Sequence, residues 1–109
     1  MAFNQKIEDR VSKIVSGWKN TGAKKMFGGV CYLLDGKMFS GIYKDFLILR
    51  LGEKASKDAL ELPFVRPFDI TGRPRKGWVM IEMEGFKSDS DLIAWLNRAK
   101  EFVKGLPSK

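Results

Sequence analysis

The chain has 109 residues, one cysteine, no histidine and a formal net charge of +7. A chain of this length suits one domain with a single hydrophobic core, and one cysteine excludes a disulfide bond within it. The absence of histidine excludes the ordinary zinc sites and histidine-dependent catalysis, so we expect no metal site and no cofactor.

The first predicted element is an amphipathic helix from Asn4, a residue type that often caps helices, to about Trp18. Its apolar residues recur at steps of three or four, which places them on one face. These residues are Phe3, Ile7, Val11, Ile14 and Trp18. We expect this face to pack on a sheet, and the basic residues opposite it, Lys6, Arg10 and Lys13, to face solvent.

The strongest pattern follows, between residues 26 and 51, and predicts a three-stranded antiparallel meander. Asp35-Gly36 favours a two-residue hairpin turn, because such a turn needs positive φ at both positions. Lys44-Asp45 separates the second strand from the third. The expected strands are Gly28–Leu34, Lys37–Tyr43 and Phe46–Leu51, and residues 20–23 before them are expected to form a loop.

The first strand of this meander is apolar at every position from residue 30 to residue 34. This pattern indicates burial on both faces and a place away from the edge of the sheet. Cys31 is then a small buried hydrophobic residue, because a reactive thiolate needs an electropositive and partly exposed setting.

A short helix is expected next, from Glu53 to about Leu62, where Pro63 ends it. Its inward residues are expected to be Ala55, Ala59 and Leu62. The segment Val65–Ile70 then suits a strand at a sheet edge, because residues before proline are extended and proline lacks an N–H for pairing.

The last two elements are a strand and a helix. The strand begins near Trp78 and alternates, with Val79, Ile81 and Met83 on one face. The helix begins after Ser88, which with Asp91 has the spacing of a capping box, and ends at Gly105. Its inward residues recur at helical spacing and are Leu92, Leu96, Ala99 and Val103.

Together these elements predict an α+β fold in two layers, with the order α-β3-α-β2-α. The five strands form one antiparallel sheet built on the meander. Residues 1–109 are expected to be a single domain, with no second domain after it. The N-terminus lacks the apolar stretch of a signal peptide, and no apolar run approaches the roughly 20 residues that cross a bilayer. We therefore expect a cytoplasmic protein with no membrane partner.

Positive charge is concentrated in two segments. Residues 1–25 contain six lysines and arginines against two acids, and residues 66–77 contain four against one. Basic residues near aromatic side chains such as Phe68 and Trp78 are typical of surfaces that bind phosphates and stack on bases. The alternative is a solvated, charged hairpin tip. The candidate anion or nucleic-acid surface comprises Lys24, Lys25, Arg66, Arg73, Arg75 and Lys76.

The sequence offers little for catalysis. Glu82 and Glu84 lie two residues apart and are expected on the same face of the last strand, where a pair of carboxylates can have one raised pKa. Alternation instead predicts that both face solvent or a basic neighbour. We therefore expect a protein that is not an enzyme.

A series of turns resembles the N-terminal domain of the TfoX/Sxy family in its short, stand-alone form. The resemblance covers about residues 24–109. It rests on Met26-Phe27-Gly28-Gly29, Asp35-Gly36-Lys37-Met38, Arg66-Pro67-Phe68-Asp69, Thr71-Gly72-Arg73-Pro74, Lys76-Gly77-Trp78-Val79, Glu84-Gly85, Ser88-Asp89, Ala94-Trp95 and Leu106-Pro107.

The resemblance implies an α+β fold with an antiparallel sheet and supplies no catalytic motif. The best-known members regulate natural competence, by promoting transcription of DNA-uptake genes together with the cyclic-AMP receptor protein. They carry a second domain that resembles helix-hairpin-helix modules, which is not expected here.

Two functions remain open from the sequence. The first is a small regulatory or adaptor domain that binds another protein through an edge strand or an uncovered sheet face. In one version of this hypothesis, the partner is a second copy of the chain and the protein is a homodimer. The alternative is weakly sequence-specific binding of nucleic acid through the basic residues named above.

Overall fold

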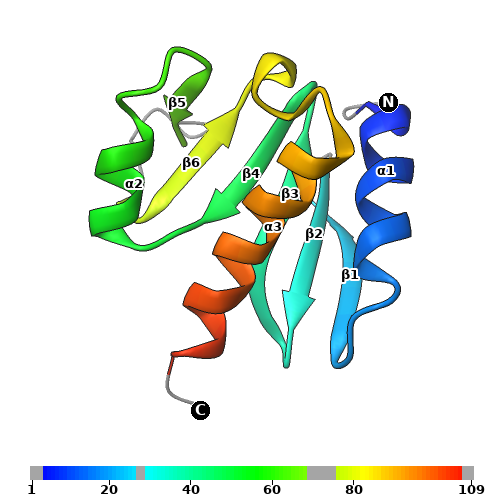
Figure 1. Cartoon of the computed structure of the whole chain (residues 1–109). Coiled ribbons are helices and arrows are strands. Elements are labelled where there is room, and N and C mark those ends of the chain that lie inside the picture. Colours follow the sequence, from blue (N-terminus) through cyan, green and yellow to red (C-terminus); the bar gives the residue numbers. More distant parts are fainter. Residues whose placement is uncertain (1–3, 27–28, 69–75, 107–109) are drawn as a thin grey trace.

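The computed structural model describes residues 4–26, 29–68 and 76–106 (Figure 1). Within these residues the helices are α1 (Gln5–Val15), α2 (Glu53–Ala59) and α3 (Asp89–Lys104), with a short 3₁₀ helix η1 (Met83–Phe86). The strands are β1 (Thr21–Met26), β2 (Gly29–Leu34), β3 (Lys37–Tyr43), β4 (Phe46–Arg50), β5 (Val65–Pro67) and β6 (Trp78–Ile81). None of these helices has the length and apolar character needed to cross a bilayer.

The six strands form one antiparallel sheet in the order β1-β2-β3-β4-β6-β5. The predicted meander is confirmed as β2, β3 and β4. Asp35 and Gly36 both have positive φ, 51° and 79°, as the two-residue turn between β2 and β3 requires. β5 is confirmed as an edge strand, and the end of the segment predicted for it, Ile70, lies outside the described residues.

The prediction of five strands is wrong, because residues 21–26 form a sixth strand, β1, where a loop was expected. β1 pairs with β2 along its whole length, from Thr21 opposite Leu34 to Met26 opposite Gly29. Its sequence, TGAKKM, has no alternation of apolar and polar residues, so periodicity did not indicate it. β1 also confirms that β2 lies away from the edge of the sheet, and every residue of β2 except Leu33 is buried.

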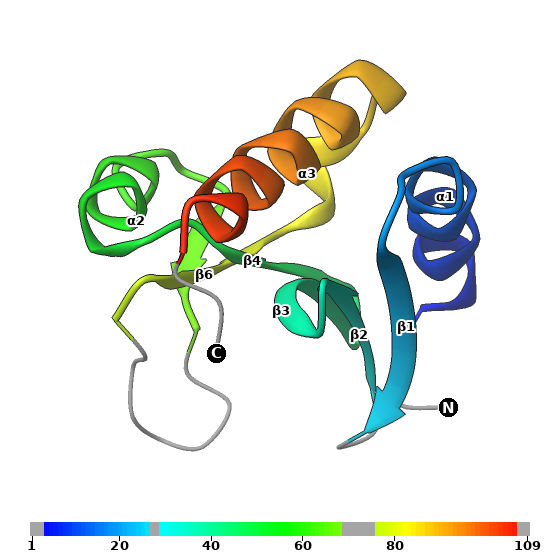
Figure 2. The same ribbon diagram turned by 90° about the horizontal axis from the view of Figure 1, so that it is seen from below.

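The three helices lie on the same side of the sheet, which gives the two predicted layers (Figure 2). Between the layers is one core, to which β2, β4 and β6 contribute alternate residues, β3 contributes Phe39 and Ile42, and α1 and α3 contribute their apolar faces. The predicted inward residues of α3 are confirmed: Leu92, Leu96, Ala99 and Val103 are at most 1% exposed. Of those predicted for α2, Ala59 is buried, but Ala55 and Leu62 are exposed.

The last strand is shorter than predicted, because β6 ends at Ile81 and the chain turns into η1. Gly85 allows this turn to pack closely on the sheet, because a Cβ atom there would overlap the ring of Phe64 and the side chain of Ile81. The indole Nε1 of Trp95 donates a hydrogen bond to the Gly85 carbonyl at 3.0 Å. Met83 therefore does not continue the inward face of the strand and is 47% exposed.

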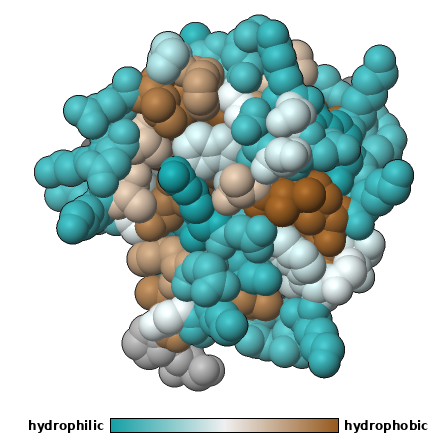
Figure 3. All heavy atoms as spheres, in the orientation of Figure 1, coloured by the Kyte–Doolittle hydropathy of each residue, from teal (hydrophilic) through white to brown (hydrophobic). Residues whose placement is uncertain are grey.

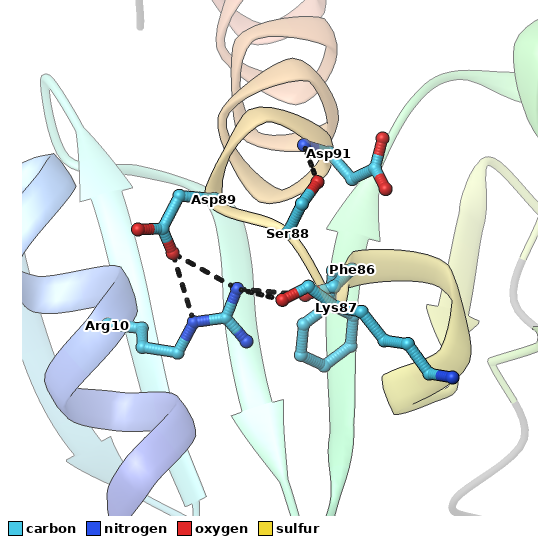
Figure 4. Close-up of polar contacts among 6 residues, drawn as sticks. All are labelled: Arg10, Phe86, Lys87, Ser88, Asp89 and Asp91. Atoms are coloured by element: carbon cyan, nitrogen blue, oxygen red, sulfur yellow. Dashed lines mark hydrogen bonds and ion pairs between the residues drawn. The ribbon is translucent and has the colours of Figure 1, made fainter.

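Both predicted helix caps are confirmed. The side-chain oxygen of Asn4 accepts hydrogen bonds from the backbone N–H groups of Lys6 and Ile7, at 2.9 and 3.3 Å. The Ser88 hydroxyl accepts one from the N–H of Asp91 at 3.1 Å (Figure 4). Such caps satisfy the N–H groups that a helix start leaves unpaired.

Arg10 does not face solvent freely, contrary to the prediction for the outer face of α1. Its guanidinium donates to the backbone carbonyls of Phe86 and Lys87, at 2.9 and 3.3 Å (Figure 4). It also forms an ion pair with Asp89 at 3.2 Å and lies over the Phe86 ring. Arg10 therefore connects α1 to the junction between η1 and α3.

Candidate protein-interaction site

A groove of about 660 Å³ runs between α2 and α3 on the helical face of the protein. Its base contains Leu51 and Ala59, each 4% exposed. Its walls contain Ala55 from α2 and Ala94 from α3, both exposed. Because alanine side chains are short, two neighbouring helices leave a channel between them here that longer side chains would fill.

The apolar surface continues beyond the base of this groove. Four large apolar side chains among the described residues are substantially exposed, and Leu62, at 39%, lines the groove. Ile93, at 40%, lies one helical turn before Asn97, which lines the groove from α3. In Figure 3, apolar residues gather along the seam between α2 and α3. An exposed apolar run with a polar margin is typical of an interaction site.

The margin of the groove is polar and carries both signs of charge. Asp58 from α2 and Glu101 from α3 contribute carboxylates, and neither forms an ion pair with another described residue. Arg98 contributes a guanidinium that lies 5.1 Å from the centre of the Trp95 ring. Arg98 also forms no ion pair with another described residue, so these three side chains give the margin a net charge of −1.

Four of the six basic residues singled out from the sequence are described, and three of these lie on opposite edges of the sheet. Lys24 and Lys25 lie on β1, at one edge of the sheet, and Arg66 lies on β5, at the other edge. Five strand spacings separate these edges, about 24 Å in a flat sheet. Lys76 lies in the turn before β6, while Arg73 and Arg75 lie outside the described residues.

The edge positions suggest a structural role for several of these residues. Natural sheets protect their edges with lysines and prolines, which oppose pairing with another strand. β1 carries Lys24 and Lys25, and β5 carries Pro67 beside Arg66. The charge of Arg66 is also already paired, because its guanidinium forms an ion pair with the Glu82 carboxylate at 2.6 Å. Both edges are therefore poorly suited to adding a strand from a partner.

The two carboxylates considered for catalysis are separated by the end of β6. Glu82 follows the strand and pairs with Arg66, whereas Glu84 lies in η1 and pairs with Lys87 at 3.1 Å. The prediction that they share one face of a strand is wrong. The described residues contain no group of three or more potential metal-binding side chains of the His, Cys, Asp and Glu types.

Burial raises the pKa of two side chains, Cys31 and Tyr32. Burial raises the pKa of the Cys31 thiol, as expected for a small hydrophobic residue within the sheet. Burial also raises the pKa of Tyr32 to about 12, while its hydroxyl lies 3.3 Å from that of Ser12. Neither group lines the groove between α2 and α3.

Reasoning from the sequence missed the groove. Ala55 and Leu62 were read as core residues, since their helical spacing with Ala59 is the spacing of a buried face. The one available signal was that α2 is short and rich in small and charged residues, with little apolar area to bury. Such a helix leaves its neighbour partly uncovered.

Comparison with known proteins gives one result that bears on this fold. The family model for the TfoX N-terminal domain matches residues 13–103, which is most of the chain. No curated protein and no solved structure shows a significant match. The match includes β1 to β6 and nearly all of α3, and so contains both walls of the groove. The chain belongs to the TfoX N-terminal domain family.

Proposed function

We propose that this protein is a small regulatory adaptor that acts by binding another protein rather than by catalysis. The family, which suggests a role in regulating competence, supports a regulatory function of this kind. The observation that carries the proposal is the groove between α2 and α3, with its apolar base, short-side-chain walls and exposed Leu62.

The shape of the groove favours an α-helical segment of the partner. A groove between two helices accepts an amphipathic helix whose apolar residues recur at i, i+3, i+4 and i+7. α2 has seven residues, which gives a wall about 10 Å long at 1.5 Å per residue. A groove of that length contacts roughly two turns of helix.

The net negative charge of the margin, −1 from Asp58, Glu101 and Arg98, favours a partner helix with basic flanks. Asp58 and Glu101 stand at the margin without ion pairs to other described residues. Lysines or arginines beside the apolar stripe of the partner would meet these carboxylates. Such exposed pairs contribute mainly to partner choice and to the rate of association.

Capture of partners by three matched baits tests this proposal. Ala55→Arg places a long side chain in the groove, and Ala23→Arg makes the same change at an exposed site on β1. We expect wild type and Ala23→Arg to retain the same partners from the native cytoplasm, and Ala55→Arg to lose them. Equal retention by all three proteins would reject the groove as the contact surface.

A second candidate function, nucleic-acid binding, is supported by a lysine cluster that the sequence did not indicate. Lys19 follows α1, and Lys100 and Lys104 lie in the last turns of α3. The three line a hollow of about 260 Å³ with Trp18. Lys100 Nζ lies 4.3 Å from the centre of the Trp18 ring. None of the three forms an ion pair with another described residue.

The salt dependence of DNA binding tests this second candidate. Three phosphate contacts on duplex DNA predict a log–log salt slope of about −2.7, measurable by fluorescence anisotropy with labelled oligonucleotides. The variant Lys19→Gln/Lys104→Gln should weaken binding, and Lys24→Gln/Lys25→Gln, with the same loss of charge, should not. If the protein does not bind the labelled DNA even at low salt, nucleic-acid binding is excluded as its function.

A further inference from the structure

The groove between α2 and α3 has a narrow end and a wide end. Gly52, which precedes α2, lies against Phe102 near the end of α3, because a Cβ atom at residue 52 would overlap that ring. The two helices run in opposite directions and diverge from this end (Figure 1 and Figure 2). The wide end therefore lies between the end of α2 and the start of α3, beside Leu62 and Ala94.

Three neighbouring apolar side chains lie at the wide end and form what we name the η1 ledge: Leu62, Phe64 and Met83. Leu62 lines the groove and is 39% exposed, and Met83, in η1, is 47% exposed. Phe64 connects them, because its carbonyl accepts a hydrogen bond from the Glu82 N–H at 2.9 Å and its ring lies against Gly85. The apolar surface of the groove therefore continues past α2 onto η1.

α3 extends its wall of the groove in the same direction. The groove residues Ala94, Asn97 and Glu101 lie on one face of this helix, and Asp91 lies on that face three residues before Ala94. The wall from residue 91 to residue 101 is about 15 Å long at 1.5 Å per residue, which is nearly three turns. α2 alone supplies a wall of about 10 Å.

Asp91 adds a negative charge to this extended surface. Its side chain is exposed, forms no ion pair with another described residue, and points away from Arg10 (Figure 4). Together with Asp58, Glu101 and Arg98, it gives the surface a net charge of −2. The whole chain has a formal net charge of +7, so this surface is opposite in sign to the rest of the protein. Such a surface favours a basic partner.

We propose that the partner helix lies along this extended surface for about three turns, with its largest apolar side chain over the η1 ledge and with lysines or arginines on its flanks. This arrangement rests on the proposed function, since the same groove holds the partner. Small side chains of the partner fit the narrow end, and a large one such as phenylalanine fits the wide end. Met83 suits this contact, because its flexible thioether chain adapts to the shape of the partner.

Three synthetic peptides test the arrangement by fluorescence anisotropy. The first is a lactam-bridged helix of about 15 residues, with alanine at i, leucines at i+3, i+4 and i+7, phenylalanine at i+11 and lysines on both flanks. The second has alanine in place of the phenylalanine. The third has glutamates in place of the lysines.

The phenylalanine peptide should bind the wild type with a Kd below about 1 mM, and the alanine peptide about five- to thirtyfold more weakly, since it buries less apolar area. Met83→Ser should weaken the phenylalanine peptide about three- to tenfold and leave the alanine peptide unchanged, because both substitutions remove the same contact. The control Leu60→Ser replaces a side chain that is 38% exposed and does not line the groove, so it should change neither affinity.

The glutamate peptide tests the charge of the surface. It should bind at least about fivefold more weakly than the phenylalanine peptide with lysine flanks at about 50 mM salt, and the difference should shrink at higher salt. The net charge of the whole chain attracts the glutamate peptide, so a preference for lysines reports the local surface. Asp91→Asn should reduce that preference.

The variant Ala55→Arg separates failure of this inference from failure of the proposed function. If it abolishes binding, while Met83→Ser binds the phenylalanine peptide as tightly as the wild type does, the groove holds the helix without the η1 ledge and the inference is wrong. If no peptide binds saturably up to about 1 mM, or if Ala55→Arg has no effect, the groove is not the contact surface and both fail. Tighter binding of the glutamate peptide would also contradict the inference.

Discussion

Arg10 gives the most direct prediction about what connects α1 to the rest of the fold. Its guanidinium donates to the carbonyls of Phe86 and Lys87 and pairs with Asp89 (Figure 4). The ion pair contributes about 0–1 kcal/mol, because the Asp89 side chain is 79% exposed. The carbonyl contacts contribute more, because hydrogen bonds from a charged donor stabilise by about 1.5–3 kcal/mol.

We therefore predict that Arg10→Ala lowers the free energy of unfolding by about 2–3 kcal/mol. Asp89→Asn, which removes only the ion pair, should cost less than about 1 kcal/mol. Arg10→Lys should fall between them, because one ammonium can donate to the carbonyls, as Nη2 does, but it lacks the Nε that donates to Asp89 and the planar group that lies over the Phe86 ring.

Urea unfolding, followed by tryptophan fluorescence and circular dichroism, measures these differences. The three variants should share the wild-type m-value and differ in midpoint. If Asp89→Asn destabilises as much as Arg10→Ala, the ion pair with Asp89 supplies the stability of this contact, and the hydrogen bonds to the two carbonyls do not. If Arg10→Ala changes the free energy of unfolding by less than about 0.5 kcal/mol, Arg10 does not stabilise the junction between α1, η1 and α3.

Three further predictions follow from buried groups. Burial raises the pKa of Tyr32 from 10 to about 12 in the folded protein, so ionisation of Tyr32 does not affect stability below pH 10. The free energy of unfolding should fall by about 2–3 kcal/mol as pH rises from 10 through 12. In urea unfolding measured at a series of pH values, Tyr32→Phe should not show this loss. Gly85→Ala should destabilise by about 1–3 kcal/mol, because its methyl group overlaps the Phe64 ring, and an unchanged urea midpoint would contradict that packing. In the native protein, Cys31 should react with Ellman's reagent only as fast as the protein opens or unfolds, because the side chain is 8% exposed and the reagent cannot reach it. Burial also raises the pKa of the thiol, and immediate reaction would show an accessible thiolate.

The elements that the sequence predicts well are those that local chemistry determines. Asp35-Gly36 fixes a hairpin through backbone conformation alone, and Asn4 and Ser88 cap helices with their own side chains. β1 escaped prediction because its pairing depends on β2 and not on its own residues. The apolar character of β2 on both faces implied a neighbour on each side, and that signal was present in the sequence.

The candidate sites depend on distances that the sequence does not contain. The groove needs Ala55 and Ala94, 39 positions apart, to stand on facing walls. The lysine cluster needs Lys19 beside Lys104. Charge counting instead selected, among others, Lys24, Lys25 and Arg66, which the fold places on opposite edges of the sheet.

The central claim is that the groove between α2 and α3 holds a partner protein, and site-specific photo-crosslinking tests it most directly. The photoreactive residue p-benzoylphenylalanine would replace Ala94, on one wall of the groove, or Ala23, on β1 far from it. We predict discrete adducts from position 94 that Ala55→Arg abolishes, and none of these adducts from position 23. The same adducts from both positions, or no adduct from position 94, would contradict the account.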